Sequence, residues 1–205
     1  MGLLHPCYPD SSEKMLESAR LHEQGSLKFM NGDIASWREP ARFDVIFSNA
    51  ALQWCPGHEE LFSRLKESLR PGGQIAIQMP MNHDYATHLL ATSMSAEEPW
   101  NSLLHGETYD KSQHILKPED YAALLFRLGF RDQQVLQRVY GHQLESREDV
   151  IEWVKGSLLT YFQKRLSKDD YERFLGDYRY RLFERLRDEK PFFYPFKRIF
   201  IWARL

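Results

Sequence analysis

Polar side chains stand at three points of the sequence where a helix or a strand is expected to begin or end. Asp10 opens the stretch DSSE, Asp33 lies in NGDI, and Asn49 ends an apolar run. Carboxylates accept charge-assisted hydrogen bonds from ligand hydroxyls, and α/β proteins bind ligands at the carboxyl ends of their parallel strands. Structural roles fit these residues too, because Asp10 suits a helix N-cap worth about 1 kcal/mol and Asp33 suits a turn.

Small residues follow Asn49 directly, at Ala50 and Ala51. They leave room for a ligand at the end of the strand, although a closely packed strand-to-helix turn also selects small side chains. Gln53 and Trp54 come next and are candidates for the wall of such a site. Core packing explains Trp54 equally well.

The elements that must position these residues alternate between strands and helices. Strands are expected at residues 27–33, 42–49 and 74–79, and amphipathic helices from Asp10 and at 58–70. The contiguous apolar residues Val45, Ile46 and Phe47 are typical of a strand covered on both faces. This alternation predicts an α/β fold with a mostly parallel sheet and crossover helices.

The second half of the chain changes character twice. Residues 80–116 are polar and predict a long loop with short helical pieces. A helix then runs from Pro118 to Gly129, and a strand is expected at 133–142. From Ser146 two helices indicate a cap-like insertion, and the ending FKRIFIWARL predicts a buried final strand. We expect a core at 10–145, a helical cap at 146–190 and a final core strand at 191–205.

The composition limits the classes of function. The 205 residues are 42% hydrophobic and 27% charged, with a formal net charge of −2 and no basic block, so a nucleic-acid surface is not indicated. Two cysteines without framework spacing favour a reduced, cytoplasmic protein. The sequence contains no apolar run of membrane-spanning length, and its histidines lack metal-ligand spacing. We therefore expect no membrane association and no metal site.

Five stretches carry a resemblance to a known family: DSSEKMLESAR, NGDIASW, FDVIFSNAALQW, LKESLRPGGQIAIQMP and RIFIWAR. In this order they resemble the class I methyltransferases that use S-adenosylmethionine, and the stretches HQLESREDVIEWVKG and YPFKRIFIWAR are most similar to those that methylate trans-aconitate. The resemblance extends from Asp10 to the C-terminus. It implies a Rossmann-like fold, S-adenosylmethionine as cofactor and a small carboxylic acid as substrate.

The resemblance also implies that the acid before SS ends the second strand of such a sheet. A first strand, a glycine-rich loop and a helix should precede it and need roughly 30 residues, whereas nine residues stand before Asp10 and no two glycines are separated by a single residue. We interpret these nine residues as an unrelated start or as the result of a misplaced gene boundary. The predicted sheet then has a central gap and two unpaired edges, which favour self-association.

The resemblance assigns the cofactor contacts to five residues. Asp10 would accept hydrogen bonds from the ribose hydroxyls, and Asp33 would meet the adenine amino group beside the backbone of Ile34. Asn49 and Ala50 would lie next to the sulfonium and its methyl group.

The expected substrate side consists of Gln53, Trp54, His142, Trp153 and Lys155. Because a carboxylate is already ionised at neutral pH, methyl transfer to it needs no general base, and we assign no catalytic residue. Cationic groups should hold the remaining carboxylates. The family has an arginine after EWVKG, where this chain reads SLLTYF, so Arg138 or Arg179 is the candidate for that role.

Methyl transfer to a small polycarboxylic acid is therefore the expected function. The altered SLLTYF segment leaves open a methyltransferase for another acceptor, such as an acyl-carrier malonyl ester or a small phenol. The missing glycine-rich loop leaves open an inactive chain that serves as a binding or assembly partner. A nicotinamide dehydrogenase is disfavoured because no dinucleotide fingerprint is present.

Overall fold

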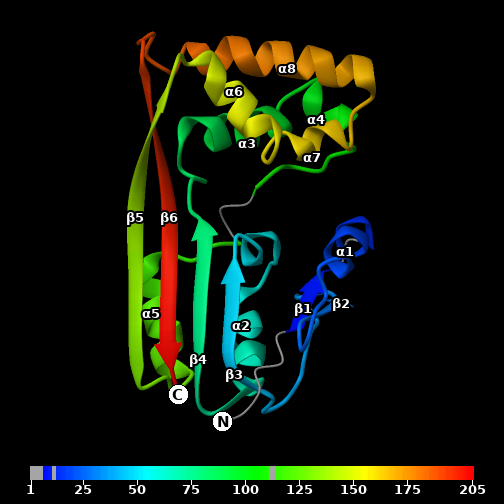
Figure 1. Ribbon diagram of the computed structural model, residues 1–205. Coiled ribbons are helices and arrows are strands. Elements are labelled where there is room, and N and C mark those ends of the chain that lie inside the picture. Colours follow the sequence, from blue (N-terminus) through cyan, green and yellow to red (C-terminus); the bar gives the residue numbers. More distant parts are fainter. Residues whose placement is uncertain (1–6, 11–12, 111–113) are drawn as a thin grey trace.

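The computed structural model describes residues 7–10, 13–110 and 114–205 (Figure 1). Its strands form two sheets. In the first, β1 (Cys7–Asp10) pairs in parallel with β2 (Lys28–Asn31). The second has the order β3-β4-β6-β5, with β3 (Phe43–Asn49), β4 (Leu69–Pro80), β5 (Asp132–Leu144) and β6 (Phe192–Arg204). β3 and β4 are parallel, whereas β6 is antiparallel to both β4 and β5.

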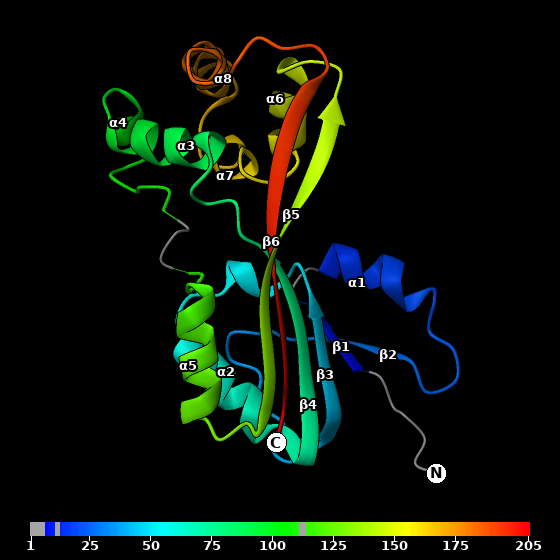
Figure 2. The same cartoon turned by 90° about the vertical axis from the view of Figure 1, so that its left-hand side faces the viewer.

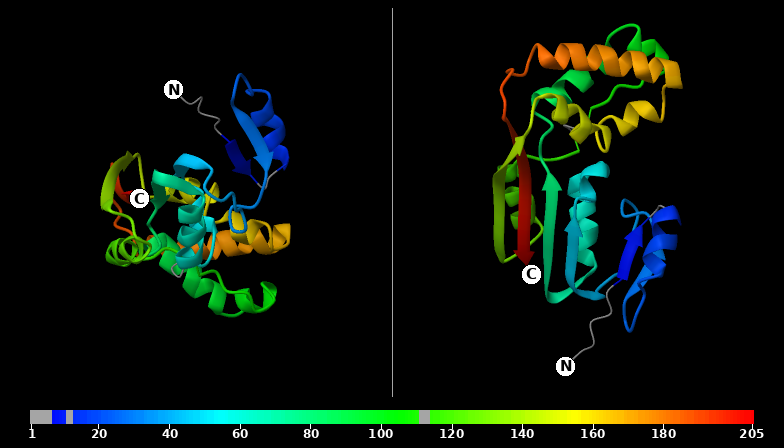
Figure 3. Two further views of the ribbon diagram at one scale, coloured as in Figure 1. Left: turned by 90° about the horizontal axis from the view of Figure 1, so that it is seen from below. Right: turned by 45° about the horizontal axis from the view of Figure 1, so that its top comes forward.

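The α/β class is confirmed by these strands and the helices between them. The two sheets are divided between β1 and β3, which is where the sequence predicts a central gap. Figure 3 shows β1 and β2 standing apart from β3. The first residues differ from expectation, because a short strand at Cys7–Asp10 leads into the first helix. Parallel pairing with β2 stabilises this strand although its own composition does not predict one.

The first helix, α1 (Glu13–Arg20), buries Leu16 and leaves Met15 62% exposed. The helix N-cap predicted at Asp10 stays a prediction, because residues 11–12 between it and the helix lie outside the described ranges. At the start of the helix the Glu13 carboxylate accepts hydrogen bonds from Arg20 at 2.7 Å and from Asn31 at 2.9 Å. The bond from Asn31 connects the helix to β2.

Two helices, α2 (His58–Glu67) and α5 (Pro118–Arg127), lie on the same face of the four-stranded sheet (Figure 2). They enclose the sheet cluster, a set of buried residues that shares one continuous core. Its members are Leu52, Cys55, Leu61, Phe62, Leu65, Leu69, Ile75, Ile77, Met79, Met81, Ile115, Tyr121, Leu124, Leu125, Phe130, Ile199, Ile201 and Ala203.

The other face of this sheet is open. Val45 is 50% exposed, Phe47 69% and Leu136 58%. The prediction that the strand at 42–49 is covered on both faces is therefore wrong. A contiguous apolar run indicates that a strand forms, but it does not indicate whether a second layer of helices covers the strand.

A second set of helices forms the cap above the sheet (Figure 1). The elements are α3 (Ala86–Ala96), α4 (Trp100–Leu103), α6 (Glu148–Lys155), α7 (Thr160–Gln163) and α8 (Lys168–Phe183). Their buried residues make up the cap cluster: Leu90, Ala91, Met94, Trp100, Leu104, Tyr109, Val150, Ile151, Val154, Leu158, Leu159, Phe162, Leu166, Phe174, Tyr178, Leu182, Leu186, Phe192, Tyr194 and Phe196. The cluster includes residues between 90 and 109, so α3 and α4 pack with the helices of the insertion.

The longest cap helix, α8, has a local explanation. The Ser167 hydroxyl caps its N-terminus by accepting the Asp170 N–H at 3.1 Å. Phe174, Tyr178 and Leu182 recur every fourth residue and are fully buried. By contrast, the predicted loop at 80–116 contains the eleven-residue helix α3. Its buried residues Leu90, Ala91 and Met94 have helical spacing, which the polar residues around them obscured.

Candidate functional site

The carboxyl end of β3 is a tight turn with exposed small residues. Asn49 and Ala50 are both exposed. Ala50 has a φ of +52° and donates its N–H to the Gln78 carbonyl at 2.9 Å. A left-handed backbone at a non-glycine residue costs about 1–2 kcal/mol, and such strain is concentrated at functional sites. The turn therefore places Asn49 at the edge of the sheet, and the small Ala50 that follows leaves the space beside it open.

A short 3-10 helix, η1 (Leu52–Trp54), follows this turn. Gln53 donates its side-chain amide to the Ala50 carbonyl at 2.7 Å, so it fastens the turn that presents Asn49. Trp54 is 52% exposed, and the alternative that it belongs to the core is wrong. Trp54 belongs to the short helix that follows Asn49, and its place in the wall of a site stays a prediction.

Asp33 and Asp10 lie at the same end of the β1–β2 sheet. The Asp33 carboxylate accepts the Ala35 N–H through Oδ1 at 2.9 Å, which is the turn role expected of it. Ile34 packs against the sheet cluster. Asp10 ends β1 opposite Asn31, two residues before Asp33. The two acids thus stand at or just after the ends of neighbouring parallel strands, and their contacts with a cofactor stay predictions.

A groove of about 900 Å³ lies on the open face of the four-stranded sheet. It extends from Asn49 on β3 across Gln78 on β4 to Arg198 on β6 and Arg138 on β5. Phe47, Tyr140, Phe200 and Trp202 supply apolar walls, and His142 stands at its cap end. One continuous surface therefore connects the turn at Asn49 with two arginines.

His142 and Trp153 are brought together although they lie on different elements. Their ring centroids are 4.7 Å apart, and Trp153 also contacts Tyr194 at 5.5 Å and Phe196 at 5.8 Å. Trp153 is 37% exposed. Because His142 lines the groove, this aromatic group joins the sheet to the cap.

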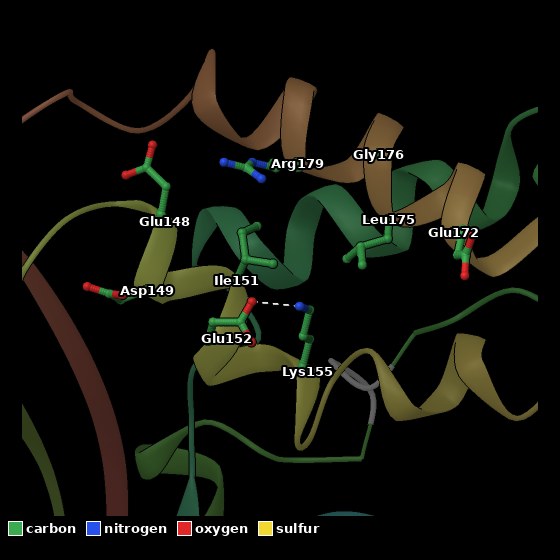
Figure 4. Close-up of a pocket in the computed structure, with 9 residues that line it drawn as sticks. All are labelled: Glu148, Asp149, Ile151, Glu152, Lys155, Glu172, Leu175, Gly176 and Arg179. Atoms are coloured by element: carbon green, nitrogen blue, oxygen red, sulfur yellow. Dashed lines mark hydrogen bonds and ion pairs between the residues drawn. The ribbon is translucent and has the colours of Figure 1, made fainter.

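Lys155 lies elsewhere, in a cleft of about 340 Å³ between α6 and α8 (Figure 4). Its ammonium group donates to Glu152 at 2.6 Å. The cleft also contains Arg179, and its lining includes four carboxylates, those of Glu148, Asp149, Glu152 and Glu172. This surplus of negative charge opposes the binding of an anion. Of the two arginines proposed from the sequence, Arg138 lies in the groove and Arg179 in the acidic cleft.

The sequence reasoning did not identify Arg198 or Gln78, and it expected the final strand to be buried. Along β6 the odd-numbered residues Ile199, Ile201 and Ala203 are at most 1% exposed, whereas the even-numbered Phe200 and Trp202 are half-buried. The strand alternates because only one of its faces meets the helices. Within FKRIFIWAR, Arg198 shares the even-numbered face with Phe200 and Trp202, and this spacing was the available signal for the groove face.

Known proteins are similar to this chain in sequence, and solved structures are similar to it in fold. Residues 6–77 match the family model described as a methyltransferase domain. The trans-aconitate 2-methyltransferase of Deinococcus radiodurans is 40% identical over 198 residues, which are 95% of this chain and 75% of that protein. That of Variovorax paradoxus is 36% identical over 199 residues, with the same two shares.

Solved structures agree at the level of the fold alone. The YcgJ protein of Bacillus subtilis is similar with a TM-score of 0.59 at 13% identity, over 97% of this chain and 81% of that one. Phosphoethanolamine N-methyltransferase 2 of Haemonchus contortus, solved with S-adenosylhomocysteine, is similar with a TM-score of 0.52 at 18% identity, over 98% of this chain and 44% of that one.

Proposed function

Because this chain belongs to the trans-aconitate 2-methyltransferase family of S-adenosylmethionine-dependent enzymes, we propose that it methylates a carboxylate of trans-aconitate or of a closely related polycarboxylic acid. The observation that carries this proposal is the 40% identity to the Deinococcus radiodurans enzyme, because it extends over 95% of the chain and so includes both the sheet and the cap. The continuous groove that begins at Asn49 supplies a surface for the acceptor.

The family uses S-adenosylmethionine, which supplies an electrophilic methyl group on a sulfonium sulfur. The residues at the carboxyl ends of β2 and β3 fit its adenosine and methyl side. Asp33 is exposed and uses Oδ1 in its turn, and Asn49 and Ala50 leave open space at the sheet edge. We propose Asp10, Asp33, Ile34, Asn49 and Ala50 as its contacts. A glycine-rich loop for the methionine part is not present in this sequence, so that part has no assigned residues.

The reaction depends more on the alignment of the acceptor carboxylate with the methyl group than on acid–base catalysis. Attack of an ionised carboxylate oxygen on the methyl carbon forms the ester as the carbon–sulfur bond breaks, and no proton is transferred. A carboxylate and a sulfonium lose their charges as the bond forms, so exclusion of water favours the step. We assign alignment of the acceptor to the groove, and we propose that Gln53, Trp54, His142 and Trp153 surround it while the cap closes over it. Lys155 is left out of this set because its cleft is acidic.

The first test is a direct assay. Purified chain with S-adenosylmethionine and trans-aconitate is expected to yield the monomethyl ester and S-adenosylhomocysteine in equal amounts by mass spectrometry. An acyl-carrier malonyl ester and catechol serve as competing acceptors. Turnover of either one in place of trans-aconitate would assign a different substrate. No product from any acceptor would contradict the proposed activity.

Cofactor binding has its own prediction. Asp33→Ala is expected to raise the dissociation constant for S-adenosylmethionine about tenfold, because a hydrogen bond to a charged group contributes about 1.5–3 kcal/mol. Isothermal titration calorimetry measures it. Asp44→Ala is the matched control, since Asp44 stands near the opposite end of β3 and pairs with Arg70 at 2.9 Å. Equal affinities in the two variants would remove Asp33 from the cofactor site.

A cytoplasmic location is part of the same proposal. Cys55 is a free, buried cysteine, which suits a reducing compartment. Within the described ranges, no helix combines the length and the apolar character of a membrane span. We also propose that its partner is a small molecule and not a nucleic acid, because acidic and basic residues are interspersed and the net charge is −2.

A further inference from the structure

Two arginines face each other across the β5–β6 pair on the groove side of the sheet. Arg138 is the register partner of Arg198, and both line the groove. Arg138 lies 5.0 Å from the Tyr140 ring centroid, and Arg198 lies 5.0 Å from that of Phe196. Arg198 also lies 5.8 Å from the Tyr140 ring centroid, so both guanidinium groups contact a ring that lines the groove.

Neither arginine has a carboxylate within ion-pair distance among the residues that the structure describes. Most other arginines of the chain do have one, such as Arg165 with Glu107 and Arg181 with Glu97. Like charges directly opposite each other on a sheet are destabilising. A pair of cations left in this position is therefore suited to a ligand that carries at least two negative charges.

Gln78 connects this pair to the turn at Asn49. It is only 8% exposed, it stands opposite Asn49 in the β3–β4 register, and its Oε1 accepts a hydrogen bond from Arg198 at 3.1 Å. Its Nε2 has no hydrogen-bond partner within the described part of the chain. β3 and β6 are two strand spacings apart, roughly 10 Å, and the long Arg198 side chain shortens that span to the size of a small polycarboxylate.

We propose that Arg198 and Arg138 hold the carboxylates of the acceptor that are not methylated, while its reacting carboxylate lies at Asn49. This inference rests on the proposed function and specifies its substrate class: a molecule with two or three carboxylates, one of which reaches the end of β3. Gln78 fixes the position of Arg198. This arginine clamp, Arg198 with Arg138, thus comes from β6 and β5 and not from the segment that follows EWVKG.

Steady-state kinetics with trans-aconitate test the clamp. Arg198→Gln is expected to raise KM for trans-aconitate about 10–100-fold, and Arg138→Gln about 5–20-fold, because each removes a charge-assisted pair with a carboxylate. KM for S-adenosylmethionine should stay within about twofold. Arg131→Gln is the matched control, since Arg131 is exposed and stands just before β5, outside the groove. Near-UV circular dichroism establishes that each variant is folded.

A series of acceptors provides a second readout that a purely structural role would not change. The wild type should prefer trans-aconitate to the dicarboxylate itaconate and to the monocarboxylate crotonate. Arg198→Gln should reduce this preference at least tenfold. An unchanged preference together with an unchanged KM would overturn the clamp while leaving the proposed function intact.

Direct binding separates the two proposals if the wild type shows no turnover. Isothermal titration calorimetry of the full chain with trans-aconitate then tests the arginine clamp without the reaction. Binding to the wild type that is lost in Arg198→Gln, and retained in Arg131→Gln, supports the clamp even though the transferase activity fails. Absence of binding, or equal binding to all three proteins, overturns the clamp.

Discussion

Phe174→Ala is expected to lower the free energy of unfolding of the cap by about 4 kcal/mol, the usual cost of truncating a buried phenylalanine. Phe174 is fully buried in the cap cluster. Its ring stacks on Phe162 at 4.2 Å, meets Trp100 edge-on at 5.2 Å and lies 6.1 Å from Tyr178. Alanine would leave a cavity among rigid rings that cannot easily collapse.

Urea unfolding followed by tryptophan fluorescence measures this loss, because Trp100 contacts Phe174 directly. At an m-value of about 2 kcal/mol/M the midpoint should fall by roughly 2 M. Phe126→Ala is the control, since Phe126 is 76% exposed on α5 and its truncation should change stability by less than about 0.5 kcal/mol. Equal midpoints for the two variants would show that the cap cluster does not stabilise the protein.

Local signals in the sequence were sufficient for individual elements. In α5, Pro118 stands in the first turn and Leu124 and Leu125 are buried. Gly129, which the sequence marks as the stop, has a φ of +84° just after the helix ends. Each of these features depends on residues within one or two turns of each other, so no knowledge of the remaining chain is needed.

Longer-range features could not be predicted in the same way. Val45 and Phe47 are apolar, but their exposure depends on whether another layer covers β3. Similarly, the ion pair of Lys155 with Glu152 is local, because the two residues are three apart on α6, but the acidic cleft around Lys155 depends on how α6 packs on α8. Patterns report the character of a side chain, whereas the fold determines its neighbours.

In the candidate site, too, the local features could be predicted from the sequence and the long-range ones could not. The ends of β2 and β3 were predictable, because Asp33 comes two residues after β2 and Asn49 is the last residue of the apolar run that forms β3. His142 and Trp153 were chosen through the resemblance, and the structure places their rings in contact. Arg198 was overlooked because its role depends on facing Arg138, sixty positions earlier in the chain, and strand register is invisible without the pairing.

Acidification from pH 7 to pH 5 is expected to lower the free energy of unfolding by about 2 kcal/mol through His88 alone. His88 lies in α3, and its Nδ1 is 3.0 Å from the Thr87 hydroxyl. Solvent reaches part of the residue, but protein surrounds the imidazole, and this burial, aided by the nearby His83, lowers its pKa from 6.5 to about 4 against the opposing effect of Asp84.

The direction of this change in the free energy of unfolding follows from proton linkage, that is, from the difference between the folded and unfolded pKa values of His88. The unfolded chain takes up the proton near pH 6.5, whereas the folded chain resists it until about pH 4. The contribution of this group is therefore complete above pH 6.5 and decreases as the pH falls, by about 3 kcal/mol in total at pH 4. Most carboxylates are still ionised at pH 5, so the interval from pH 7 to pH 5 reports mainly on histidines. His58 and His83, whose pKa values burial also lowers, add to the decrease in the wild type.

His88→Asn isolates the contribution of His88, because its amide keeps a polar atom near the Nδ1 position without a titratable ring. Urea unfolding at pH 7 and at pH 5 gives, for each protein, the change in the free energy of unfolding over this interval. The variant should lose about 2 kcal/mol less than the wild type over this interval, whatever its stability at pH 7. His22→Gln, at an exposed position in the loop after α1, should keep the wild-type difference. If His88→Asn and the wild type lose the same amount, the pKa of His88 is the same in the folded and the unfolded protein, and burial does not lower it.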